Sequence, residues 1–201
     1  MYQDYRPSVD IKLLAKWIGV LFWLTIVSIV AGLFTGNNSD ELYGIGWLIR
    51  AGADLAYGIV LLRLASEDES YRRSGICVIL CAAIGIVSTA MNVAIPGAGI
   101  MLGMIAVILT AVLDIAGEYY EFKAHAGVMS YVSQMMSDKW ERLWKWKLWT
   151  MLGMLAAVIV SILISVIGVF IALVSGIGTF VVSIMKIVYL RQTAKTLEGY
   201  E

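Results

Sequence analysis

The fold is decided by residues 74–113, SGICVILCAAIGIVSTAMNVAIPGAGIMLGMIAVILTAVL, a stretch without a single charged residue. A helix that crosses a membrane needs about 20 mostly apolar residues. This stretch is about twice that length, so it must cross the membrane and return. The turn formers Asn92, Pro96, Gly97 and Gly99 lie near its middle. The sequence therefore predicts two spanning helices, over 74–93 and 98–121.

The composition of the whole chain agrees with a membrane protein. Of its 201 residues 60% are hydrophobic and 15% are charged, whereas soluble domains are about 45–50% apolar and about 25% charged. These values exclude a disordered chain, a collagen-like chain and an ordinary soluble domain. Lysine plus arginine balance aspartate plus glutamate, so the formal net charge is zero. No nucleic-acid partner is expected, and the lipid bilayer is the first partner.

The remaining apolar runs extend this pattern to six helices. The further spans are expected over 17–34, 45–64, 148–169 and 173–191, with the last turn near 171–178. With six spans, every lysine and arginine outside the helices falls on one side, which the positive-inside rule assigns to the cytoplasm. Fusing the last two spans would place Arg191 and Lys195 on the other side. We therefore expect a single all-α polytopic domain over 1–201, built as three helical hairpins with both termini cytoplasmic.

Each even-numbered helix is expected to open near a Gly-x-Gly pattern, beginning at Gly44, Gly97 and Gly176. Two interpretations stay open. The hairpins can be parallel repeats of the kind found in some transporters. Alternatively, glycines collect at outer turns because positive φ angles cost them little.

An amphipathic helix is predicted over 128–146, between the fourth and fifth spans. Its apolar residues recur at helical spacing on one face, and polar residues fill the other. We expect this helix to lie along the cytoplasmic interface of the membrane. It serves either as an anchor or as a docking surface for a partner. Four tryptophans suit the headgroup region or a partner contact: Trp140, Trp144, Trp146 and Trp149.

Ionisable residues inside the spans are the strongest indication of a functional site. A charge near the bilayer centre costs at least about 2.5–3.5 kcal/mol, so it usually faces protein or water. Asp54 and Asp114 are too short to reach the interface, which makes them the leading candidates. Lys186 lies at a depth similar to that of Asp114, so these two residues can form a pair. The other candidates for binding a ligand or ion are Arg50, Glu118, Tyr57 and Tyr189.

Two groups of residues are candidates for metal or lipid chemistry. Asp114, Glu118, Glu121 and His125 follow one face of a helix and could bind a metal. The better interpretation is a solvated helix end, because no second helix offers matching ligands. Cys77 and Cys81 lie four residues apart and fit the core better than palmitoylation. No metal site and no cofactor are expected.

Two functions remain. The chain lacks the residue patterns of known catalytic sites, so it is not expected to be an enzyme. The first function is binding or transport of a small solute or ion in a polar intramembrane site, with a homodimer expected because six helices are few for a transporter. The second is a non-catalytic accessory, assembly or regulatory subunit that contacts another membrane protein through its helices. Short loops and the absence of a soluble domain favour a bacterial cytoplasmic membrane.

Overall fold

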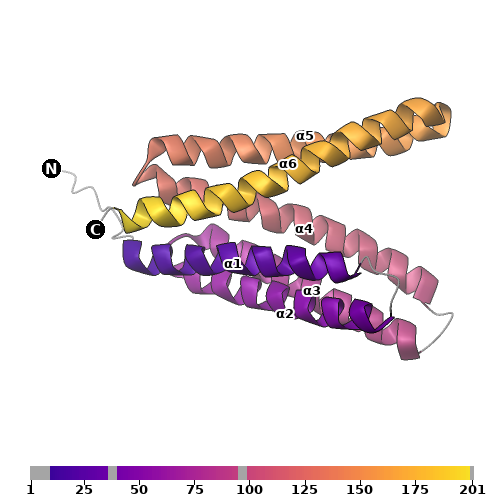
Figure 1. Cartoon of the computed structure of the whole chain (residues 1–201), viewed down its shortest axis with the longest axis horizontal. Helices are drawn as coiled ribbons and strands as arrows, with labels where there is room; N and C mark the ends of the chain where they lie inside the picture. The colour runs from indigo at the N-terminus through magenta and orange to yellow at the C-terminus, as the bar shows by residue number, and fades with distance from the viewer. Residues whose placement is uncertain (1–9, 36–39, 95–98, 200–201) are drawn as a thin grey trace.

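The computed structural model describes residues 10–35, 40–94 and 99–199. Over these ranges the protein is helical and contains no strand, which confirms the all-α prediction. Six helices are long and apolar enough to cross a membrane. They are α1 (Ile11–Thr35), α2 (Asp40–Arg63), α3 (Glu69–Ala94), α4 (Gly99–Ser130), α5 (Gln134–Leu163) and α6 (Ser165–Glu198), with a short 3-10 turn, η1 (Leu64–Ser66), after α2 (Figure 1). Of the turn formers predicted between α3 and α4, Pro96 and Gly97 lie outside the described residues.

The turn between the last two helices lies earlier than predicted. It falls at Ile164, whose backbone is extended (φ −141°, ψ 92°), and not near 171–178. A β-branched residue tolerates this conformation well, which explains how the helix can break without glycine or proline. Gly176 and Gly178 lie inside α6, and Gly44 lies inside α2. These glycines therefore do not mark helix starts.

The separate helix predicted over 128–146 is also not present. Residues 128–130 end α4, and residues 134–146 form the first turns of α5, which continues without interruption to Leu163. The sequence between Trp146 and Thr150 contains neither proline nor glycine. Once a helix is nucleated, each further residue extends it at little cost, so nothing separates the amphipathic segment from the spanning one.

The helices pack in the order of the chain. Each contacts the next, and α6 also packs against α1, so the contacts close into a ring. The ends of α6 and α2 meet the starts of α5 and α1: Lys139 donates a hydrogen bond to Gln192, and the backbone N–H of Asp10 donates one to Glu67. We call this the basic end, because nearly every lysine and arginine of the described residues lies towards it. In Figure 1 it is the end where α1 begins and α6 finishes.

The bundle is packed tightly at the basic end and loosely at the other. Its buried core draws on all six helices near the basic end, with Leu14, Leu61, Tyr71, Trp140 and Leu197 among its fully buried members. Towards the Ile164 turn, α5 and α6 diverge from the other four helices (Figure 1). The apolar side chains there are largely exposed, as expected for surfaces that face lipid.

Candidate intramembrane binding site

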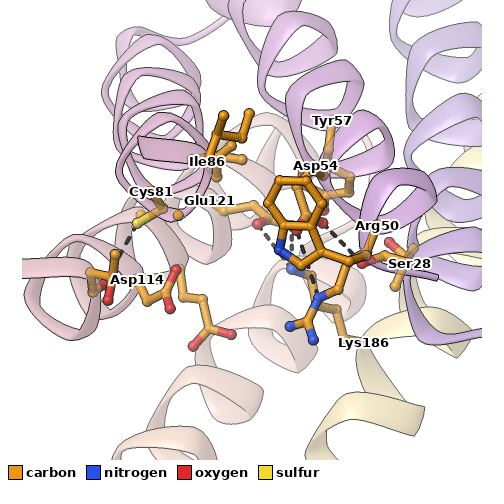
Figure 2. Close-up of a pocket in the computed structure, with 18 of the residues that line it drawn as sticks. Ser28, Arg50, Asp54, Tyr57, Cys81, Ile86, Asp114, Glu121 and Lys186 are labelled. Atoms are coloured by element: carbon orange, nitrogen blue, oxygen red, sulfur yellow. Dashed lines mark hydrogen bonds and ion pairs between the residues drawn. The ribbon is translucent and has the colours of Figure 1, made fainter. Parts of the chain in front are cut away.

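A polar cavity of about 670 Å³ lies inside the ring, beyond the tightly packed end. A volume of this size is typical of sites for small molecules, which measure about 300–1,000 Å³. Its walls come from α1, α2, α3, α4 and α6. Figure 2 shows how charged groups from several of these helices point towards one another across it.

One face of α2 forms a wall of the cavity. Tyr43, Trp47, Arg50, Asp54 and Tyr57 all line it, and their spacing of three and four residues places them on one side of the helix. The lining face spans roughly 21 Å along the helix axis, at 1.5 Å per residue. The cavity therefore begins near the start of α2 and ends close to the packed core.

Small side chains on the facing helices leave the space open. On α3 the lining residues include Cys81, Ala82 and Gly85. On α4 the carboxylates of Asp114, Glu118 and Glu121 line the cavity at helical spacing. One wall of the cavity, on α3, is therefore made of small residues, and another, on α4, is made of acidic residues.

Asp54 is held by two neighbours. The hydroxyl of Ser28 on α1 donates a hydrogen bond of 2.9 Å to its Oδ1, and Arg50 Nε lies 3.9 Å from its Oδ2. The pairing expected from the four-residue spacing is therefore present. Both side chains remain substantially exposed within the structure, at 55% for Arg50 and 40% for Asp54. An exposed ion pair of this length contributes little to stability, so both groups remain free to engage a ligand.

Asp114 is the carboxylate without a cation. Among the described residues, no lysine, arginine or histidine lies within ion-pair distance of it. The thiol of Cys81 contacts it, and Figure 2 places the two together, away from Arg50 and Lys186. The pair predicted between Asp114 and Lys186 is thus not formed. An uncompensated negative charge inside a membrane-spanning bundle is costly unless water or a cation meets it.

Lys186 pairs with Glu121 instead. Its ammonium nitrogen lies 2.9 Å from both carboxylate oxygens of Glu121. The hydroxyl of Tyr57 donates a further hydrogen bond to Oε1 of the same carboxylate. These three residues, from α2, α4 and α6, close the cavity on its inner side, and we call them the floor cluster. The sequence predicted Tyr57 and Lys186 as candidates for ligand binding, but indicated Glu121 only as a possible metal ligand.

A second layer of buried polar residues lies behind the floor cluster. His125, one turn after Glu121 on α4, is fully buried, and its Nε2 lies 3.7 Å from Glu121 Oε1. Tyr71 on α3 is also fully buried, and its hydroxyl lies 2.9 Å from His125 Nδ1. Trp140 stacks on the imidazole with ring centroids 4.4 Å apart, and donates a hydrogen bond to Thr193.

The expectation of a solvated helix end at Glu121 and His125 is therefore wrong. Both side chains are buried, with exposures of 2% and 0%. The signal in the sequence was a carboxylate and an imidazole four residues apart on a continuation of the spanning helix. Among the described residues, no group of three or more histidine, cysteine, aspartate or glutamate side chains is arranged to hold a metal ion.

Of the other predicted site residues, Glu118 lines the cavity and Tyr189 does not. Glu118 lines the cavity and pairs with Lys147 on α5 at 3.0 Å. Tyr189 faces Trp140 and Lys139 and does not line the cavity.

Of the four tryptophans expected at the interface, Trp140 is fully buried, whereas Trp146 and Trp149 are 66% and 72% exposed. Trp144 packs against Tyr119 and Phe122.

The chain matches no family model, no curated protein and no solved structure.

Proposed function

We propose that this protein binds a small cationic solute in the polar cavity and moves it across the membrane. The observation that carries the proposal is the carboxylate of Asp114, which has no cationic partner among the described residues and lines a cavity large enough for a small molecule. The other charges largely cancel, since Lys186 is matched by Glu121, Lys147 by Glu118 and Arg50 by Asp54. Asp114 leaves one negative charge over, which favours a cation.

The aromatic residues of the lining support the same chemistry. Tyr43, Trp47 and Tyr57 line the cavity together with the carboxylates. Aromatic faces attract cations, and sites for organic ammonium ions commonly combine aromatic rings with an acidic group. A metal ion would instead call for several oxygen ligands close together. A small organic cation suits both the volume and the mixed lining better.

The orientation of the protein belongs to the same proposal. The basic end faces the cytoplasm, because lysines and arginines are enriched on the cytoplasmic side of membrane proteins. The three helical hairpins then all enter from that side. The cavity then opens on the non-cytoplasmic side and ends at the floor cluster. This is the arrangement of a carrier in its outward-open state. A homodimer and a bacterial cytoplasmic membrane remain predictions of the same kind.

Cys81 offers a native reporter for the charge of the cavity. It lines the cavity, whereas Cys77 does not. In a Cys77→Ala variant we would compare the reaction rates of two thiol reagents of similar size, one carrying a trimethylammonium group and the other a sulfonate group. We expect the cationic reagent to react faster. Asp114→Asn should lower the ratio of the two rates about fivefold, because losing one charge about 9 Å from the charged group of each reagent slows the cationic reagent and speeds the anionic one about twofold each in a wet site.

The controls separate this from the alternatives. Asp138→Asn removes an exposed carboxylate at the basic end and should leave the ratio unchanged. The Cys81→Ala variant retains only Cys77 and shows how much reaction occurs outside the cavity. A faster anionic reagent would contradict the proposal. An unreactive Cys81 in a folded protein would mean that the charges are packed together, and would favour the accessory-subunit function.

A further inference from the structure

His125 carries a polar atom that the fold leaves unused. Its Nε2 is buried and has no hydrogen-bond partner among the described residues. A buried polar group without a partner costs about 1–3 kcal/mol, so such atoms call for an explanation. The imidazole is not loosely held, because Trp140 stacks on it and Tyr71 bonds its other nitrogen. The ring therefore lies with Nε2 turned towards Glu121 Oε1, at 3.7 Å.

Glu121, His125 and Tyr71 lie in a row of proton-exchanging groups, which we call the relay. It begins at Glu121, which lines the cavity. It continues over 3.7 Å to His125 Nε2 and then from Nδ1 over 2.9 Å to the hydroxyl of Tyr71. The distance between Glu121 Oε1 and His125 Nε2 exceeds a normal hydrogen bond, and a shift of the Glu121 carboxylate by about 0.5 Å brings it within range.

The far end of the relay approaches the basic end of the bundle. Tyr71 lies one turn after Asp68, and the Asp68 carboxylate is the charged group that acts most strongly on its hydroxyl. Asp68, just before α3, lines a second cavity, of about 520 Å³, between α4 and α5 at that end. The relay thus connects the neighbourhoods of two cavities that the floor cluster and the aromatic core keep apart.

We propose that the relay carries protons between the two cavities, so that the transport inferred above is coupled to proton movement. This proposal rests on the proposed function, because it takes the first cavity as the substrate site. A proton on Glu121 Oε1 passes to the lone pair of His125 Nε2. The imidazolium then releases the proton on Nδ1 to the oxygen of Tyr71, which releases its own hydroxyl proton to the carboxylate of Asp68. Glu121 takes up its next proton from the first cavity, Asp68 releases the one it received to the second, and a turn of the imidazole ring returns the His125 proton to Nδ1. Nothing is oxidised or reduced.

The residues around His125 place it at the centre of this proton exchange. The titratable groups facing it or its carboxylate partner are Tyr57 from α2, Tyr71 from α3, Glu121 from α4 and Lys186 from α6. From α5 it meets the neutral ring of Trp140. A proton on His125 gives Glu121 a second cationic neighbour, so that the Glu121 carboxylate is no longer paired with Lys186 alone. This weakens the ion pair between Lys186 and Glu121. Proton movement is thereby linked to the floor cluster that closes the cavity.

The test uses the full chain in liposomes loaded with a pH-sensitive dye. A potassium gradient with valinomycin makes the interior negative, with and without an inward gradient of tetramethylammonium, a cation that cannot itself carry a proton. We expect the interior to acidify at least fivefold faster than in protein-free vesicles in at least one condition. Tyr71→Phe removes one oxygen and should reduce the rate to within twofold of protein-free vesicles. His125→Gln should do the same.

Tyr131→Phe is the matched control, since it removes an exposed hydroxyl at the basic end and should not change the rate. Elution as a single folded species is checked for each variant. Two results would overturn the proposal: no acidification by the folded wild-type protein in either condition, or equal rates in wild type and both relay variants. If acidification is absent while Cys81 still prefers the cationic reagent, only the relay fails. If Cys81 is unreactive as well, the proposed function fails with it.

Discussion

At the scale of single residues, Lys186 and Glu121 hold each other where neither reaches water freely, with side-chain exposures of 17% and 2%. Breaking a buried ion pair by removing one partner leaves an uncompensated charge, whereas replacing both partners by neutral groups is often tolerated. Glu121 also accepts the hydrogen bond of Tyr57. The carboxylate therefore links α2, α4 and α6, and the loss of its cation should be felt in all three.

We predict that Lys186→Met lowers the free energy of unfolding by about 3 kcal/mol or more, the usual cost of leaving a buried charge unpaired. The double variant Glu121→Gln with Lys186→Met should recover at least half of this loss, because glutamine is neutral and can still accept the Tyr57 hydrogen bond. Unfolding in mixed micelles, followed by circular dichroism, measures both. Lys195→Met, at an exposed position of the same helix, is the control. A double variant less stable than the single one would contradict the pairing.

The partner of Lys186 could not be chosen from the sequence for a geometric reason. Asp114 and Glu121 lie seven residues apart, so both fall on the same face of α4, separated by roughly 10.5 Å along its axis. A lysine side chain is long and flexible enough that either carboxylate is a possible partner. Which carboxylate it meets depends on how far α4 and α6 are shifted along each other, and that shift is set by packing. The identity of the charged helices could be predicted, but the pairing could not.

At the scale of helices, α2 and α3 approach each other through Gly58 and Gly75. A Cβ atom on Gly75 would lie 2.9 Å from the carbonyl oxygen of Gly58 and 3.0 Å from Leu62 Cγ. A Cβ atom on Gly58 would lie 2.6 Å from Ile79 Cγ1. Small residues at such crossings let backbones approach closely, a common basis of helix association in membranes.

We predict that Gly75→Val forces α2 and α3 apart and lowers the free energy of unfolding by about 1–3 kcal/mol, the typical cost of overpacking. Gly85→Ala on the same helix meets nothing within 4 Å and should be neutral or slightly stabilising, since alanine favours helix. Thermal unfolding of both variants in one detergent gives the comparison. Equal melting temperatures for the two variants would show that this crossing is not close in the protein.

The helices also show where sequence patterns fail. Helix number followed from the lengths of the apolar runs, which depend only on membrane thickness. The α5–α6 turn did not, because the long uncharged run around it contains no proline, and its glycines serve packing instead. Gly178, for example, faces Thr150, where a Cβ atom would lie 2.7 Å from Thr150 Cγ2. A glycine at a helix contact and a glycine at a turn look the same in a sequence.

At the scale of the whole molecule, the packing is asymmetric along the bundle axis. The buried core lies towards the basic end, and the cavity occupies the part beyond it. The floor cluster separates the two. If the basic end is cytoplasmic, a polar reagent should reach the cavity from the opposite side only.

We predict that in a Cys77→Ala variant an impermeant thiol reagent labels Cys81 from the non-cytoplasmic side at least tenfold faster than from the cytoplasmic side. The reason is that Cys81 lines the cavity, while Tyr57, Glu121 and Lys186 close it on the inner side. Right-side-out and inverted membrane vesicles give the two rates. A Lys195→Cys variant that also carries Cys77→Ala and Cys81→Ala should show the reverse preference, because position 195 is exposed at the basic end. Labelling of both sites from one side would reverse the assigned orientation of the cavity. Rapid labelling of Cys81 from both sides would mean that the floor cluster opens freely, and would turn the carrier proposed here into a channel.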